Sequence, residues 1–546
     1  MYHKQVGQVH GRKSGLPVTL PIVFVATLTI YLSCAAPSIM YGDSAELQAV
    51  ALEGGVAHPT GYPTFILLGQ VFGRVLGGDE AHRITAMSAI FGAAAVCAFL
   101  VVLLKFGLPL RAATAGAVIY ALSFTFFWSA IRTEVYTVAI FIFFVGLWLT
   151  LHALERPVPA RAALAGLFLG LVLTGHLTFV PPVMVMLVAL ILARPTDGGS
   201  RAKYIAALAV AFTAGLLPYL YLVYADRAGY ALNYLDFKID PAGGQYGLTP
   251  ETFDDPWERI PWLILGTESQ PTVFLVHLRP MIWQIQRVLS IEFIYHFGPV
   301  ALPLFVLGIH QAARRLHRRV LLLLAIILAS ALFGAGFGVG RMLQIFLIPS
   351  TIGIAVTVSF GIWFILERIP GDSRQLRWIW HAMLIVLVLC IVLVPHALRV
   401  RLQDSPSFPD DMKMHVEGEP EIRTFIPRLN DFWEPRRYGE RVLDLVPENA
   451  FVAGKWKEIT VLYYLHYVEG ARPDITLDEY VPGHYIRLNR WQEKHGLATH
   501  PIVFLRHPSV LQAEITNVDT LRVNDEQSLF ICRKPFEPLL PPARRP

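Results

Sequence analysis

The chain has 546 residues, of which 54% are hydrophobic and only 16% are charged, and its formal net charge is +5. In soluble domains roughly a quarter of all residues are charged, so this composition excludes an ordinary soluble protein and indicates an integral membrane protein. The basic residues gather at the ends of apolar segments, which fits membrane orientation and gives no sign of a nucleic-acid partner. The four cysteines show no metal-binding spacing, so no disulfide framework, metal site or cofactor is predicted.

Apolar segments long enough to cross a bilayer, which takes about 20 residues, recur along the first 400 positions. We count about eleven, at approximately 17–36, 83–104, 111–129, 133–154, 160–177, 179–194, 203–224, 290–312, 319–338, 342–366 and 378–397. The first is longer than the apolar core of a secretory signal, so we expect it to remain as a transmembrane helix. A shorter stretch at 62–77 contains Arg74 and predicts an interfacial helix.

The basic residues also predict the orientation, because cytoplasmic loops carry an excess of Lys and Arg. With the N-terminus in the cytoplasm, the short connections on the opposite side hold few basic residues, namely Arg74, Arg83, Arg132 and Arg341. The pattern predicts a multi-pass protein of the cytoplasmic (inner) membrane with its C-terminus outside. Polar residues of the outer connections should then share one outward-facing chamber.

The composition becomes that of a soluble protein after Pro395. From about residue 436, helical segments alternate with short apolar strands, which is typical of a small α/β domain, and no glycine-rich phosphate-binding loop is present. We therefore divide the chain into a transmembrane domain (1–397, with outer loops at 38–82 and 226–289), a linker (398–435) and an extracytoplasmic α/β domain (436–546).

The first outer loop carries the strongest candidate for chemistry. Asp43 and Glu46 are three residues apart and would share one face of a helix. Asp43 fits a general base that takes a proton from an acceptor hydroxyl, a helix N-cap or a solvated loop carboxylate. Glu46 either tunes Asp43 through its like charge or completes a capping pattern. His58 lies in a proline-rich turn, where a structural role is the more common one.

Other polar residues lie at the outer ends of predicted spans. Arg132 and Glu134 either pair at the interface or contact substrate, and His176 fits a substrate hydroxyl or a phosphate. Arg341 stands between two apolar segments, where it suits a lipid phosphate or anchors to ordinary headgroups. In the long loop, Asp236 and Gln245 are candidates for acceptor or sugar contacts.

Two linked motifs in the first outer loop resemble a known family. Asp43-Ser-Ala-Glu46 followed by Ala57-His-Pro-Thr-Gly-Tyr-Pro63 is similar to the D-S-G-E-L and A-H-P-P-G-Y-P signature of a protein O-mannosyltransferase family found in bacteria and animals. Thr133-Glu-Val-Tyr136, Gly175-His-Leu-Thr178 and Asn233-Tyr-Leu-Asp236 extend the resemblance through the membrane part. Ala45 and Thr60 depart from the usual glycine and proline.

The resemblance implies a GT-C glycosyltransferase that draws a sugar, with a mannose-like hexose favoured, from a polyprenyl-phosphate carrier. By this resemblance Asp43 activates the acceptor in an inverting displacement, and Arg341 lies near the carrier phosphate. The expected partners are the lipid-linked sugar, a protein or glycan acceptor and membrane lipids. The resulting assignments are catalytic for Asp43 and Glu46, donor-phosphate binding for Arg341 and His176, and substrate binding for His58, Tyr62, Arg132, Glu134, Tyr136, Asp236 and Gln245.

Two non-enzymatic alternatives stay open. A transporter or lipid-carrier flippase of a cell-envelope glycan pathway would carry inverted repeats and charges near span centres, whereas the charges here gather at one face. A membrane scaffold that presents the C-terminal domain would need neither Asp43 nor Arg341.

Overall fold

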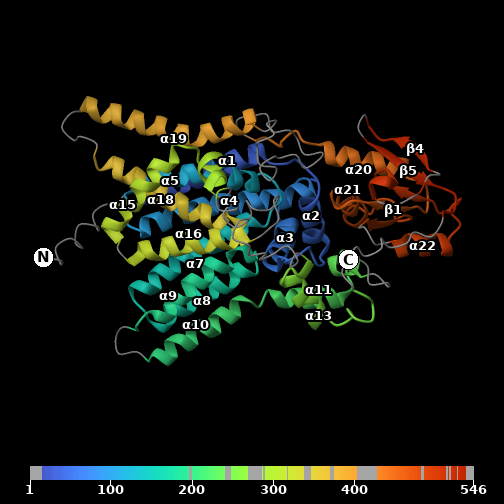
Figure 1. Ribbon diagram of the computed structural model, residues 1–546, viewed down its shortest axis with the longest axis horizontal. Helices are drawn as coiled ribbons and strands as arrows, with labels where there is room; N and C mark the ends of the chain where they lie inside the picture. The colour runs from blue at the N-terminus through green and yellow to red at the C-terminus, as the bar shows by residue number, and fades with distance from the viewer. Residues whose placement is uncertain are drawn as a thin grey trace.

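The computed structural model shows a body of long helices joined to a C-terminal α/β part (Figure 1). It describes residues 15–195, 200–239, 248–268, 286, 289–316, 318–336, 346–368, 374–402, 427–480, 485–511, 515, 518–524 and 527–536.

Six helices among these residues are long and apolar enough to cross a membrane, and a seventh span arises if the bent pair α5 and α6 counts as one. The six are α1 (Leu16–Cys34), α4 (Glu80–Lys105), α7 (Tyr136–Glu155), α10 continued by α11 (Arg201–Gly215 and Tyr219–Ala228), α18 (Ile348–Leu366) and α19 (Arg374–Leu402). The pair α5 (Leu110–Ala121) and α6 (Phe124–Ala130) bends by 68°. The multi-pass character is thereby supported, whereas the span count of eleven and the orientation stay predictions.

Shorter helices complete the body. They are α8 (Pro159–Leu173), the single turn η2 (Leu177–Phe179), α9 (Val180–Leu192), the π-helical turn η4 (Ile291–His296), α15 (Ala301–Leu316) and α16 (Arg318–Gly336). Together with the longer helices, they place described helix in each of the eleven apolar segments.

The helices pack closely where small residues meet. A Cβ atom at Gly170 of α8 would lie 2.1 Å from the carbonyl oxygen of Phe212 in α10, so these two helices touch through their backbones. The outer helices α1, α10 and α19 expose apolar side chains such as Val25, Val210 and Val386, as expected of surfaces that face lipid.

The first outer loop contains two helices, α2 (Asp43–Glu53) and α3 (Pro63–Val75), which lie at the end of the body that faces the C-terminal part (Figure 1). The helix predicted at 62–77 is confirmed as α3. Asp43 is not an N-cap: Gly42 holds that position with φ 61°, and Asp43 is the first helical residue. The described part of the long loop adds α12 (Tyr234–Lys238) and α13 (Pro256–Ile264).

The C-terminal part is built on a five-stranded mixed sheet in the order β2-β1-β3-β5-β4. Its strands are β1 (Phe451–Gly454), β2 (Thr476–Glu479), β3 (Ile502–Phe504), β4 (Asp519–Arg522) and β5 (Ser528–Cys532). Strands β1, β2 and β3 run parallel, and β5 lies antiparallel to both β3 and β4. The helices are α20 (Glu434–Leu445), α21 (Trp456–Tyr463) continued by the π-helical turn η6 (Tyr464–Val468), α22 (Tyr485–Lys494) and the short η7 (Pro508–Leu511).

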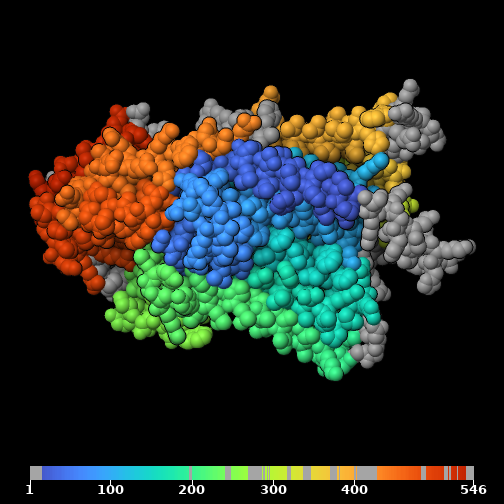
Figure 2. All heavy atoms as spheres, turned by 180° about the vertical axis from the view of Figure 1, so that it is seen from behind, coloured from blue at the N-terminus to red at the C-terminus, as the bar shows by residue number. Residues whose placement is uncertain are grey.

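Four of these strands lie close to where the sequence predicts them, and β4 was missed because its side chains are all exposed and carry no apolar alternation. Seen from behind, the C-terminal part covers one end of the molecule and adjoins both the N-terminal segment and the segment that contains α11 to α13 (Figure 2). The exact domain limits stay a prediction.

Candidate active site

The first turn of α2 presents two carboxylates. Asp43 and Glu46 both lie there, close to the positive end of the helix dipole, which favours negative charge. The turn is anchored to the body, because Ser44 Oγ donates to the carbonyl oxygen of Thr133 at 2.8 Å. One turn further on, buried Gln48 accepts from the backbone N–H of Met40 and donates to three oxygen atoms around it, and so fixes the loop that leads into α2.

Glu46 holds His58. One carboxylate oxygen accepts the backbone N–H of His58 at 2.8 Å, and the other contacts His58 Nδ1. The Glu46 side chain is 5% exposed and that of His58 is 20% exposed, so the pair lies largely out of water. Burial alone would lower the pKa of His58, but the carboxylates of Glu46 and Asp43 outweigh it and raise this pKa to about 9. Burial also raises the pKa of Glu46, opposed by the charge of His58.

Tyr62 contacts the second ring nitrogen of His58. Its hydroxyl donates to the carbonyl oxygen of Pro59 at 2.6 Å, so its oxygen accepts from His58 Nε2, 3.1 Å away. Both ring nitrogens then act as donors, which fits an imidazolium ion at neutral pH. His58 is therefore a fixed positive charge between two carboxylates.

His176 lies behind Tyr62. The two rings stack with centroids 5.5 Å apart at 12°, and the ring of Tyr136 lies 5.1 Å from His176 on another side. His176 Nδ1 accepts the backbone N–H of Thr178 at 3.0 Å, which leaves the proton of the neutral ring on Nε2.

Asp43 is more exposed than the other members of the cluster. Its side chain is 49% exposed, and its Oδ2 lies 3.8 Å from His58 Nε2. Its other oxygen, Oδ1, accepts the indole N–H of Trp456 at 2.7 Å, and Trp456 belongs to the C-terminal part. A carboxylate that is fixed at one oxygen and accessible at the other can accept a proton from a substrate hydroxyl.

Arg132 and Glu134 form an ion pair of 2.6 Å at the edge of the cluster. Thr133 lies between the two in sequence, and its carbonyl oxygen accepts from Ser44 Oγ at 2.8 Å, so the pair adjoins the first turn of α2. Arg132 also lies over the ring of Trp128, 5.0 Å from its centroid. The two predicted residues thus pair with one another close to Asp43.

The segment from 233 to 239 forms another wall. Val56 pairs with Asn233 as an isolated parallel bridge, which brings this segment to the first outer loop. The ring of Tyr234 lies edge-on to His58, with centroids 6.4 Å apart. Asp236 points elsewhere: it is half exposed and bonds to Arg259 at 2.5 Å. Within α12, Tyr234 rather than Asp236 therefore reaches the cluster.

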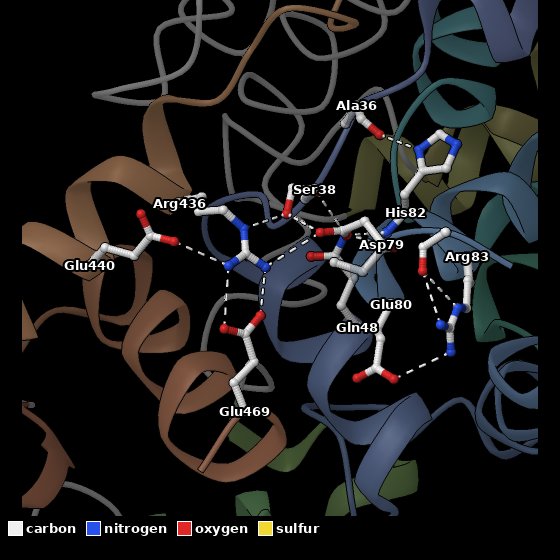
Figure 3. Close-up of polar contacts among 12 residues, drawn as sticks. Ala36, Ser38, Gln48, Asp79, Glu80, His82, Arg83, Arg436, Glu440 and Glu469 are labelled. Carbon is white, nitrogen blue, oxygen red and sulfur yellow. Dashed lines mark hydrogen bonds and ion pairs between the residues drawn. The ribbon is translucent and has the colours of Figure 1, made fainter. Parts of the chain in front are cut away.

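Polar contacts join the C-terminal part to the loop beside the site (Figure 3). The guanidinium group of Arg436 in α20 donates to Ser38 Oγ at 2.7 Å and pairs with Asp79 at 3.4 Å and with Glu469 at 2.5 Å. Asp79 in turn caps α4 by accepting the backbone N–H of His82 at 2.9 Å. One cation therefore ties α20 to the start of α4.

Two predicted site residues, Arg341 and Gln245, lie outside the described residues. Sequence reasoning did not single out Trp456, and it included Tyr234 only as part of the motif Asn233-Tyr-Leu-Asp236, although both residues contact the cluster. Among the residues that the structure describes, no group of three or more His, Cys, Asp or Glu side chains is arranged to hold a metal ion.

Fold and site together define a multi-pass membrane protein with a carboxylate–histidine cluster between its first two long helices, α1 and α4. Residues 43–198 match the family model described as the protein O-mannosyl-transferase TMEM260 N-terminal domain. The protein O-mannosyl-transferase TMEM260 of Mus musculus is 30% identical over 212 residues, which cover 37% of this chain and 29% of the mouse protein. The protein of the same name from Dictyostelium discoideum is 38% identical over 77 residues, 14% of this chain and 9% of its own length.

These alignments span less than a third of each relative. Among solved structures, the oligosaccharyltransferase of Archaeoglobus fulgidus in its apo form is similar with a TM-score of 0.47 and 14% identity, over 89% of this chain and 69% of that one. The archaeal oligosaccharyltransferase AglB from Archaeoglobus fulgidus, in complex with an inhibitory peptide and a dolichol-phosphate, gives a TM-score of 0.47 and 14% identity over 90% of this chain and 70% of that one.

Proposed function

We propose that the protein is a GT-C type glycosyltransferase that moves a sugar, with a mannose-like hexose favoured, from a polyprenyl-phosphate carrier to a hydroxyl group on a protein. The reaction takes place at the outer face of the cytoplasmic membrane. The observation that carries the proposal is the position of the cluster: Asp43, Glu46, His58, Tyr62 and His176 converge in space and all fall within the family domain at 43–198.

Asp43 is the general base in this proposal. The acceptor oxygen attacks the anomeric carbon of the sugar, its proton passes to Asp43 Oδ2, and the bond from that carbon to the phosphate oxygen breaks. The electron pair leaves with the polyprenyl phosphate, and the attack from the opposite face inverts the anomeric configuration. The half-exposed carboxylate is the support for this role.

Glu46 acts as a positioning residue, because its carboxylate is taken up by the backbone and ring of His58. His176 accepts the backbone N–H of Thr178 at Nδ1, so it would serve the donor phosphate through a hydrogen bond from Nε2 rather than through charge. Phosphate binding by Arg341 stays a prediction. So does substrate binding by His58, Tyr62, Arg132, Glu134, Tyr136, Asp236 and Gln245.

The test is transfer of labelled mannose from polyprenyl-phosphate-mannose to a peptide acceptor by the purified full chain. Asp43→Asn should lower kcat by about 100-fold or more, the scale of general-base catalysis. The matched control is Asp254→Asn, an exposed aspartate of the long loop, which should match the wild type.

Full activity of Asp43→Asn would remove Asp43 as the base. Movement of the lipid carrier across the bilayer without any transfer by the wild type would instead favour the transporter or flippase alternative.

A further inference from the structure

We propose that the C-terminal α/β part completes the active site by supplying Trp456, which positions the carboxylate of Asp43. This inference rests on the proposed function, since it assigns a residue to the same reaction. Trp456 is a positioning residue: it contacts the base and is not assigned a contact with the reacting atoms.

The fold delivers Trp456 to this place. Strand β1 ends at Gly454, and Trp456 is the first residue of α21, so it projects from the carboxyl end of a strand that is flanked on both sides by parallel neighbours. Its indole N–H reaches Asp43 Oδ1 at 2.7 Å across 413 positions of sequence. Its ring lies edge-on to His58, 6.2 Å away at 77°, and to Tyr234, 5.6 Å away at 86°.

The contact controls which way Asp43 points. With Oδ1 held by the indole, Oδ2 stays 3.8 Å from His58 Nε2, beyond a direct hydrogen bond. Without the indole N–H, the half-exposed carboxylate is free to turn onto the imidazolium ion and form a close ion pair. The oxygen that accepts the substrate proton would then be occupied, so the chemical step would slow while substrate binding changed little.

Contacts other than the indole hydrogen bond also hold the C-terminal part against the loop that carries Asp43. The backbone N–H of Gly42, the residue before Asp43, donates to the carbonyl oxygen of Lys457, the residue after Trp456, at 3.3 Å. Further along, Lys238 of α12 bonds to Glu479 at the end of β2 at 3.0 Å, and both side chains are largely buried. The approach of Trp456 to Asp43 is therefore built into the backbone and does not depend on one flexible side chain.

The test compares Trp456→Phe, which keeps a ring and removes the N–H, with Trp433→Phe, a partly exposed tryptophan at the start of α20. In the mannose-transfer assay, Trp456→Phe should lower kcat by about 10- to 100-fold, as expected for a lost hydrogen bond to a charged group, with KM changed less than about 3-fold. Trp433→Phe should match the wild type. Equal kcat for Trp456→Phe and the wild type would overturn the inference. Loss of activity in Asp43→Asn would still support the proposed function in that case.

A second measurement is independent of any activity. The thermal unfolding temperatures of the full chain, its Asp43→Ala and Trp456→Phe variants and the double variant form a cycle, because alanine removes the oxygen that accepts the indole N–H. If the side chains interact, the double variant should be less destabilised than the sum of the two single changes. Strictly additive shifts would overturn the contact, and with it the inference, whatever the reaction proves to be.

Discussion

Replacing Glu46 by glutamine tests the buried pair at the centre of the site. The change keeps the shape of the side chain and removes the negative charge that faces His58 Nδ1. The pKa of His58 should then fall from about 9, because burial remains and the main compensating carboxylate is gone.

The size of the effect follows from linkage. A rise of the His58 pKa from 6.5 to about 9 corresponds to about 3 kcal/mol of stability. A raised pKa on a basic group means that this stability is fully present below about pH 6.5 and is lost as the pH rises through about 9. The raised pKa of Glu46 lowers stability, because burial opposes ionisation of this carboxyl group. The net gain in the free energy of unfolding from the pair is therefore at most about 3 kcal/mol.

The assay is thermal unfolding of the full chain in detergent at a series of pH values. We expect Glu46→Gln to unfold several degrees below the wild type near pH 6.5 and the gap to narrow as the pH rises past 9. A gap of the same size at all pH values would refute the charge-based explanation and leave only a lost hydrogen bond.

Two further changes probe the surroundings of the site. Arg436→Met removes the cation that joins α20 to the start of α4, and it should lower the free energy of unfolding by about 1–3 kcal/mol in a denaturation assay. The control is Arg437→Met at the exposed neighbouring position, which should unfold like the wild type. Gly55→Ala would place a Cβ atom 2.0 Å from the carbonyl oxygen of Leu232 at a φ of +130°, so we expect a loss of at least about 2 kcal/mol together with reduced transfer activity. Gly77→Ala, where a Cβ atom meets open space, is the matched control, and an equal loss in both variants would contradict this explanation.

Local spacing predicted the parts of the fold that depend on local interactions. The interval between Asp43 and Glu46 correctly placed both carboxylates in one helical turn, and the apolar segments correctly marked where helices occur. Alternating apolar runs likewise marked the strands of the C-terminal sheet, except the fully exposed β4.

Local sequence patterns could not predict which side chains contact one another in the site, because these contacts depend on tertiary packing. The sequence placed His58 in a proline-rich turn but gave no sign of its contact with Glu46. Asp236 was named as a candidate in the long loop. In the structure its side chain pairs with Arg259, and Tyr234 of the same helix lies against His58. A signal for Trp456 did exist: polar or aromatic residues just beyond the carboxyl end of a parallel strand often line functional sites in α/β folds.

The long separation between Asp43 and Trp456 also has a consequence for biosynthesis. The two side chains meet across 413 positions, so a ribosome must finish the whole membrane body before the second partner exists. A nascent chain that has inserted its helices but not yet folded its sheet holds Asp43 without the indole that fixes it. The order of synthesis thus keeps the first outer loop in an incomplete state until the last part of the chain has folded against it.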